Sequence, residues 1–168
     1  MEIKDKHGRL LHKIEDKLRD FSDLDLPEAV FAEMLQQGAH FSGSNLTGAD
    51  FRGADLYWSI FFLANLTSAN FERAQLQGAD FKQANLTKAN LRDANLGRDN
   101  VGGSTQLQSA NLTGAELRGA KLDGAEYDEH TIFPLGFHAE KKNLIFKSPK
   151  SFHEKAGVSQ VGFSFSSL

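Results

Sequence analysis

The side chains that most often carry out chemistry are sparse in this sequence and do not form the groupings that chemistry needs. The chain has no cysteine, so it offers no thiolate nucleophile, thiolate metal ligand or disulfide. Its serines and threonines are not accompanied by a GxSxG elbow or by a base with an orienting partner. The histidines show no HxH or HxxxH spacing, and they stand at positions 7, 12, 40, 130, 138 and 153. We therefore expect a protein that is not an enzyme, with no catalytic residue, no metal site and no cofactor.

Composition and charge limit the classes of partner. With 168 residues the chain has room for one domain or one elongated repeat array. Nineteen Lys and Arg against 22 Asp and Glu give a net charge of −3, which argues against a basic nucleic-acid groove. The opening MEIKDKHGRLLHKIEDK is too charged for a secretory signal, and no apolar run approaches the roughly 18 residues that span a bilayer. We expect a cytoplasmic protein with no direct nucleic-acid partner and no membrane partner.

A five-residue repeat runs through the middle of the chain. Each block has a large apolar residue, here called the anchor, and a small residue, usually Ala, two positions before it. A period of five fits neither the 3.6 residues of a helix nor the 2.0 of a strand, so the backbone must turn a corner once per block. The anchors are Phe41, Leu46, Phe51, Leu56, Phe61, Leu66, Phe71, Leu76, Phe81, Leu86, Leu91, Leu96 and Val101.

The anchors also repeat with every fourth block. Phenylalanines at this spacing form two columns, with leucines in the columns between them, so four blocks should make one coil. Such coils would stack Phe on Phe along two opposite sides, and these columns are the predicted core. Their members are Phe21, Phe41, Phe61 and Phe81 in one column and Phe31, Phe51 and Phe71 in the other.

The blocks resemble the A(D/N)LXX repeats of the pentapeptide-repeat proteins over about residues 19 to 132. The resemblance implies an all-β fold, a right-handed quadrilateral β-solenoid or β-helix with about 20 residues per coil. Coils are then expected to stack at the strand spacing of about 4.7 to 4.9 Å, with backbone hydrogen bonds between them. The stretches RDNVGGSTQLQ and GAEYDEHTIFP further resemble a bacterial subgroup of this family.

One segment, LPEAVFAEMLQQG at 26–38, also fits a short helix. Pro27 suits a first helical residue and Gly38 a position just past a helix end. The five-residue phase favours the solenoid, because Phe21, Leu26 and Phe31 are in register with Phe41 and only Gln36 is a poor anchor.

The ends of the chain lack the repeat. We divide the sequence into a hairpin cap at 1–18, the solenoid at 19–132, and a C-terminal cap with an irregular, flexible tail at 133–168. The hairpin is expected to turn around Lys6-His7-Gly8 and to cover the first coil, whose open edge would otherwise invite aggregation. Its apolar contacts would come from Ile3, Leu10 and Ile14. The last coil is expected to close near 132–134, and beyond about residue 147 the phenylalanines 163 and 165 are available to dock.

Large apolar residues replace polar ones in one place in the array, DLYWSIFFLANL. We expect these side chains to point outward around a single corner, where they form a candidate protein-binding patch. Three interpretations stay open: the hairpin or the tail covers the patch, a partner or a second copy binds it, or it stays bare. The patch consists of Tyr57, Trp58, Ile60, Phe62 and Leu63.

The repeat is also interrupted at GRDNVGGSTQLQ, residues 97–108. Val101 and Leu107 are six residues apart, which indicates one inserted residue, and the flexible glycines favour a local kink over a recognition loop. The candidate bulge consists of Arg98, Asp99, Asn100, Gly102 and Gly103.

Three functions fit these observations. The first is a scaffold or protein-binding module, such as an immunity or adaptor protein, that uses the aromatic patch. The second is a DNA mimic that binds or protects DNA gyrase or another topoisomerase, as the best characterised relatives do. The third is a self-assembling structural element. The expected partner is an unidentified protein, or a second copy bound through the patch or the ends.

The charge of the array ranks the DNA mimic below the scaffold. Residues 39 to 128 hold ten Asp and Glu against eight Lys and Arg, and this net −2 is a poor imitation of a phosphate backbone. The sequence also indicates neither a long projecting loop nor a dimerising C-terminal helix, which the gyrase-binding relatives have.

Overall fold

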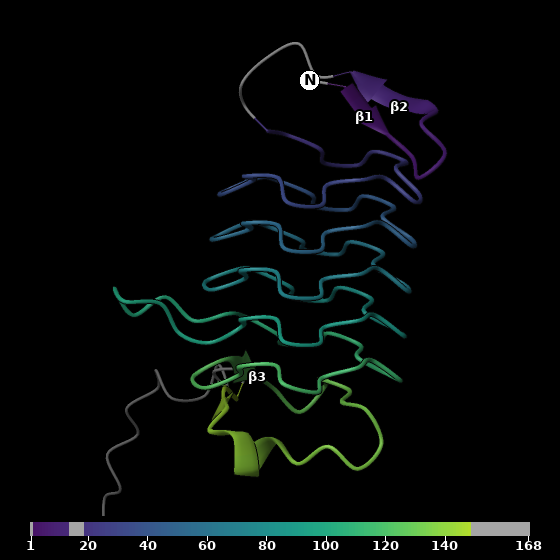
Figure 1. Ribbon diagram of the computed structural model, residues 1–168. Helices are drawn as coiled ribbons and strands as arrows, with labels where there is room; N and C mark the ends of the chain where they lie inside the picture. The colour runs from purple at the N-terminus through teal and green to yellow at the C-terminus, as the bar shows by residue number, and fades with distance from the viewer. Residues whose placement is uncertain (1, 14–18, 149–168) are drawn as a thin grey trace, which may run out of the picture.

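The computed structural model describes residues 2–13 and 19–148 as a stack of coils with a short paired element at each end (Figure 1). The hairpin strands β1 and β2 lie at the N-terminal end, and strand β3 lies near the other end. No helix in this part of the chain is long and apolar enough to cross a membrane. The elements are β1 (Glu2–Lys4), β2 (Leu10–Lys13), β3 (Glu126–Tyr127), the 3-10 helix η1 (Ala139–Lys142) and β4 (Ile145–Phe146).

Each coil is hydrogen-bonded to the next along its backbone. Isolated parallel bridges join residues four blocks apart, as in Asp20↔His40, His40↔Ile60 and Ile60↔Asp80. The anchor N–H donates to the following coil, for example Phe41 N to the Ile60 carbonyl at 2.7 Å. Four five-residue blocks therefore make one coil, as the sequence predicts. Long strands do not form, because the chain turns a corner in every block.

Each corner is a tight turn with one residue in the left-handed backbone region. The small residue that ends the turn donates back to the anchor, as Ala64 N does to the Phe61 carbonyl at 3.0 Å. In the regular blocks the second residue after the anchor has a positive φ, 59° at Leu63 and 73° at Gly78, whereas Arg98, after the anchor Leu96, does not. A type II turn requires this conformation, which costs a residue with a side chain about 1–2 kcal/mol.

Phenylalanines fill the core as two stacked ladders. Within a column the ring centroids lie 4.6–4.9 Å apart and the planes are within 6° of parallel. Between the columns, rings meet edge to face at 5.3–5.9 Å. All seven predicted core phenylalanines are fully buried. The alanines beside them are buried too, and their small side chains leave room for the rings.

The segment 26–38 belongs to the solenoid and is not a helix. The bridges Asp25↔Asn45, Val30↔Asp50 and Leu35↔Asp55 place it in the coil stack. Gln36 occupies an anchor position and is only 3% exposed, so this polar residue still faces inward.

The hairpin β1–β2 pairs with the first coil. Val30 N donates to the Lys4 carbonyl at 2.9 Å, and Ile3 is fully buried against the core. Its turn contains Gly8 with a φ of 80°. The expected contact from Leu10 is wrong: Leu10 is half exposed, and Leu11 packs against the core instead, because the strand pairing turns Leu10 outward. Ile14 lies outside the described residues.

At the other end the coil path continues beyond residues 132–134. Leu112 N donates to the Ile132 carbonyl at 2.7 Å, and the chain then passes through η1 to β4. Strand β4 pairs in parallel with β3, and Ile145 N donates to the Ala125 carbonyl at 2.8 Å. The expected tail beyond residue 148, including the phenylalanines 163 and 165, lies outside the described residues.

The interruption at 97–108 is larger than expected. From Asp80 to its bridged partner Gln106 the chain is six residues longer than from Gln106 to its partner Glu126, so six residues have been inserted and not one. Val101 is 81% exposed and is not an anchor. Thr105 and Leu107 are buried and restore the inward pattern. Residues 97–104, the inserted loop, project from the side of the stack (Figure 1).

The Phe ladders should dominate stability. Phe61 stacks on Phe41 and Phe81, so Phe61→Ala opens a cavity in the middle of a column and should lower the free energy of unfolding by about 3–5 kcal/mol. Chemical denaturation measures this loss. The control Lys121→Ala, at an exposed position, should change it by less than about 0.5 kcal/mol. Equal effects of the two changes would contradict the ladder as the main source of stability.

Candidate functional site at the aromatic corner

The five patch residues lie on two consecutive turns of one coil, the turn after Leu56 and the turn after Phe61, and this stretch is here called the aromatic corner. Tyr57 and Trp58 follow the anchor Leu56, while Ile60, Phe62 and Leu63 flank the next anchor. None of the five is buried. Trp58 is 46% exposed and Leu63 is 53% exposed, and the other three are half-buried.

The inserted loop is fastened to this corner by one carboxylate. The Tyr57 hydroxyl donates to Asp99 Oδ2 at 2.8 Å, and Trp58 Nε1 donates to the same oxygen at 2.9 Å. The two interruptions of the repeat therefore form one site. Of the two covering segments that the sequence suggests, the hairpin pairs with the first coil instead, and the tail lies outside the described residues. The inserted loop contacts Tyr57 and Trp58 and leaves Trp58 and Leu63 partly exposed.

Asp99 also organises the loop itself. Its other carboxylate oxygen, Oδ1, accepts from the backbone N–H of Val101 at 2.9 Å and of Gly103 at 2.5 Å. The Asp99 N–H donates to the Gly103 carbonyl at 2.9 Å. Partial burial would raise the pKa of Asp99, but the hydrogen bonds from Tyr57, Gly103, Trp58 and Val101 outweigh it and lower this pKa. The bond to Asp99 in turn raises the pKa of Tyr57.

Two glycines make room for the indole ring. A Cβ on Gly78 would lie 2.9 Å from Trp58 Cε2, and one on Gly103 would overlap Trp58 Cζ2. The ring thus lies across the next coil and against the loop. Gly78 was not among the residues that the sequence suggested, although it stands four blocks after Trp58, which places it directly beneath that residue in the stack.

The remaining loop residues divide into a base and a tip. Arg98 continues the coil ladder, since its N–H donates to the Asp123 carbonyl at 2.9 Å. Asn100, Val101 and Gly102 form an exposed tip. The interpretation of this stretch as a local kink is therefore wrong, because six extra residues form a loop with its own internal hydrogen bonds and a contact two coils away.

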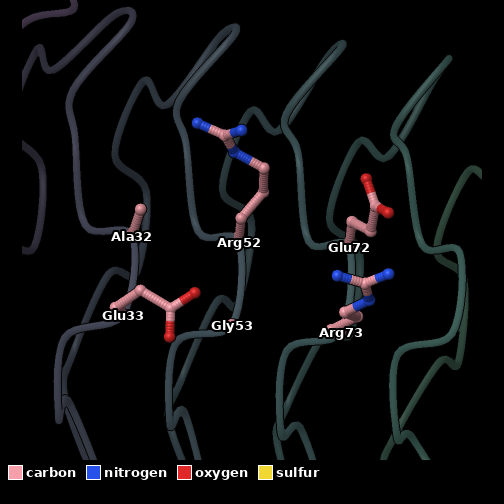
Figure 2. A pocket seen from close by; sticks show the side chains of 6 residues that line it. All are labelled: Ala32, Glu33, Arg52, Gly53, Glu72 and Arg73. Atoms are coloured by element: carbon pink, nitrogen blue, oxygen red, sulfur yellow. The ribbon is translucent and has the colours of Figure 1, made fainter.

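A second feature, which the sequence did not suggest, is a charged hollow along the turns that follow Phe31, Phe51 and Phe71 (Figure 2). Arg52 is held by Asp50, with Nη2 and Oδ2 2.6 Å apart, and this hydrogen bond raises the pKa of Arg52. Glu33 extends over Gly53, where a Cβ would overlap its carboxylate. Charges of opposite sign alternate here, and the described residues hold no group of three His, Cys, Asp or Glu that suits a metal ion. The lining residues are Ala32, Glu33, Arg52, Gly53, Glu72 and Arg73.

The Asp99 contact is open to a direct test, because Trp58 is the only tryptophan. Asp99→Asn removes the charge and turns one acceptor into a donor, so the loop should leave the corner. We expect a red-shifted Trp58 emission and stronger acrylamide quenching. The control Asp93→Asn, at an exposed position away from the indole, should change neither. Identical spectra for all three proteins would contradict the fastening role of Asp99.

The same contact should respond to acid. Because the folded pKa of Asp99 lies below its ordinary value of 3.8, its contribution is complete above pH 3.8 and is lost as the pH falls through the folded value. Trp58 emission of the wild type should shift in that range while far-UV circular dichroism still reports a folded stack. Asp99→Asn should show no such step, and a step of equal size in this variant would assign the transition to another group.

Comparison with known proteins places this geometry in a family. The model for pentapeptide repeats matches residues 25–61, 64–98 and 104–126 in eight copies, so the match leaves out residues 99–103 of the inserted loop. A search of the curated proteins found no match.

Solved structures give the same assignment. HetL, a pentapeptide repeat protein involved in heterocyst differentiation regulation from the cyanobacterium Nostoc sp. strain PCC 7120, is 34% identical with a TM-score of 0.63, over 65% of this chain and 46% of HetL. The pentapeptide repeat protein Rfr23 from the cyanobacterium Cyanothece 51142 is 33% identical with a TM-score of 0.52, over 66% of this chain and 64% of Rfr23. The chain thus spans less than two thirds of the length of either protein. With more than half of its residues in matched repeats, it belongs to the pentapeptide repeat family.

Proposed function

We propose that this protein is a scaffold or protein-binding module whose contact surface is the aromatic corner together with the tip of the inserted loop. The partner is a protein that presents apolar side chains to Trp58 and Leu63. The family match supports a repeat scaffold, and the corner is where this scaffold departs from its own regular pattern.

The observation that carries the proposal is that two large apolar side chains, Trp58 and Leu63, are exposed at a turn position that the neighbouring blocks fill with Gly or a polar residue. Trp58 and Leu63 have φ values of 57° and 59°, in a region where bulky residues are rare. Glycine occupies the same turn position one coil away in each case, Gly78 beside Trp58 and Gly43 beside Leu63. The turn can therefore form without a large apolar side chain, and large apolar residues kept exposed at this position support a role in binding.

The loop prepares this surface for binding. Asp99 fixes the indole through Nε1, and Gly103 packs against the ring, so Trp58 loses little freedom when a partner arrives. Val101 adds an apolar side chain that is 81% exposed at the tip. Trp58 and Tyr57, both held by Asp99, are of the residue types that are enriched in binding hot spots.

The charge of the array supports an apolar partner surface over DNA mimicry. Ten acidic and eight basic side chains between residues 39 and 128 leave a net charge of −2, far from the charge density of duplex DNA, which carries one negative charge per about 1.7 Å of its axis. One sequence-based reason against a gyrase partner, the lack of a projecting loop, is wrong, because the inserted loop projects. The charge argument does not depend on that loop.

A matched pair of glycine variants tests the proposal. Leu63→Gly and Arg73→Gly both remove a side chain from a left-handed turn position, with φ values of 59° and 60°, but only Leu63 is at the aromatic corner. Relief of strain and added chain entropy nearly cancel, so each should change the free energy of unfolding by less than about 1 kcal/mol. Chemical denaturation measures that change.

Binding should separate the two variants. A protein cross-linked to the wild-type corner in extract of the source cell is identified and purified, and its dissociation constant is then measured for each variant. Leu63→Gly should weaken binding at least about tenfold, while Arg73→Gly should bind like the wild type. Equal affinity of Leu63→Gly and the wild type would overturn the assignment of the corner as the contact surface.

A further inference from the structure

The C-terminal end of the described stack has an unpaired strand edge. Strand β4 pairs with β3 on one side only. In an inner coil, the anchor Leu107 donates its N–H to the Glu126 carbonyl of the next coil at 2.7 Å. Phe146 follows Leu107 and Tyr127 in the same column, and among the described residues its N–H has no such acceptor. Open edges of this kind invite pairing with another strand.

The side-chain column is incomplete at the same place. Phe81 and Leu107 are fully buried, whereas Phe146 is 52% exposed. Its ring meets Tyr127 edge to face at 5.4 Å, and its other side has no ring contact within the described part of the chain. Leu144, two residues earlier, is half-buried against the core. One further inward-facing pair of residues would complete this column.

The sequence beyond the described residues contains a segment with the required pattern. In VGFSF, residues 161–165, apolar residues alternate with Gly and Ser, the period of a strand with one buried face. Phe163 and Phe165 follow Leu144 and Phe146 by 19 residues each. Leu144 and Phe146 themselves follow Ala125 and Tyr127 by the same interval, and the pairing Tyr127↔Phe146 shows that this spacing makes one coil here.

We propose that residues 161–165 of the same chain dock as a parallel strand on the free edge of β4, with Phe165 over Phe146 and Phe163 over Leu144. The Phe146 N–H then donates to the Ser164 carbonyl, as the anchors of inner coils do. Residues 147–160 make the connection, and a parallel crossover of a dozen or more residues is long enough. The docked strand closes this end of the solenoid, as the hairpin β1–β2 closes the other.

The absence of native cysteines allows a direct test with an engineered pair. Ile145→Cys with Ser164→Cys places two thiols opposite each other on neighbouring strands about 4.8 Å apart, within the range of a disulfide, and keeps every phenylalanine. Under mild oxidation this pair should form an intramolecular disulfide at least about tenfold faster than the control Ile145→Cys with Ser159→Cys. Equal rates for the two pairs would overturn the proposal, and so would a dominant disulfide between two copies, which would assign the edge to a second chain.

Hydrogen exchange provides a second test of the docked strand, in proteins without engineered cysteines. In the wild type the Phe146 amide should exchange slowly, and Phe163→Ser with Phe165→Ser should speed its exchange at least about tenfold. The control Phe152→Ser, also beyond the described residues but outside the alternating pattern, should leave this rate unchanged. A Phe146 amide that exchanges equally fast in all three proteins would contradict the docked strand.

Discussion

The stacking of like side chains four blocks apart along the chain is the interaction on which the rest of this molecule depends. Each ring of a Phe ladder lies about one strand spacing from the next, 4.6–4.9 Å, which is also the separation that the backbone hydrogen bonds between coils require. Rings and hydrogen bonds thus favour the same register. Because the regular part of each coil contacts only its neighbours, its stability is close to a sum over coils and their interfaces. A local irregularity is then tolerated, provided that the anchors return to register.

The insertion at 97–104 shows what sequence periodicity can predict in this fold and what it cannot. The five-residue phase detects only the remainder of an insertion after division by five, so six extra residues look like one. Val101 is apolar and stands five residues after Leu96, so the pattern predicts an anchor there. In the structure Val101 is exposed. The four-block period holds the missing information, because the next member of the Phe81 column is Leu107 and not Val101. The core could therefore be predicted, since it repeats, and the loop could not.

Part of the site could have been predicted from the same columns of residues four blocks apart. Tyr57 and Gly97 occupy the same position of their blocks two coils apart, so the insertion begins at the corner that carries the aromatic residues. That relation would have joined the two interruptions into one site. The role of Asp99 could not be predicted in this way, because a loop has no period to fix where its side chains point. Its hydrogen bonds to Tyr57 and Trp58 depend on the path of the loop backbone.

The turn geometry explains why the corner can hold a large ring at all. Side chains at the left-handed position extend along the stack toward the next coil, where glycine often stands: Glu33 lies over Gly53, and Asp93 lies over Gly119. Trp58 over Gly78 is the same arrangement with a larger side chain. The indole needs the glycine beneath it and a neighbour beyond it, and Gly103 of the loop supplies the neighbour. Aromatic corner and loop are thus mutually dependent, since the corner gives Asp99 its two side-chain donors and the loop holds the ring in place for a partner.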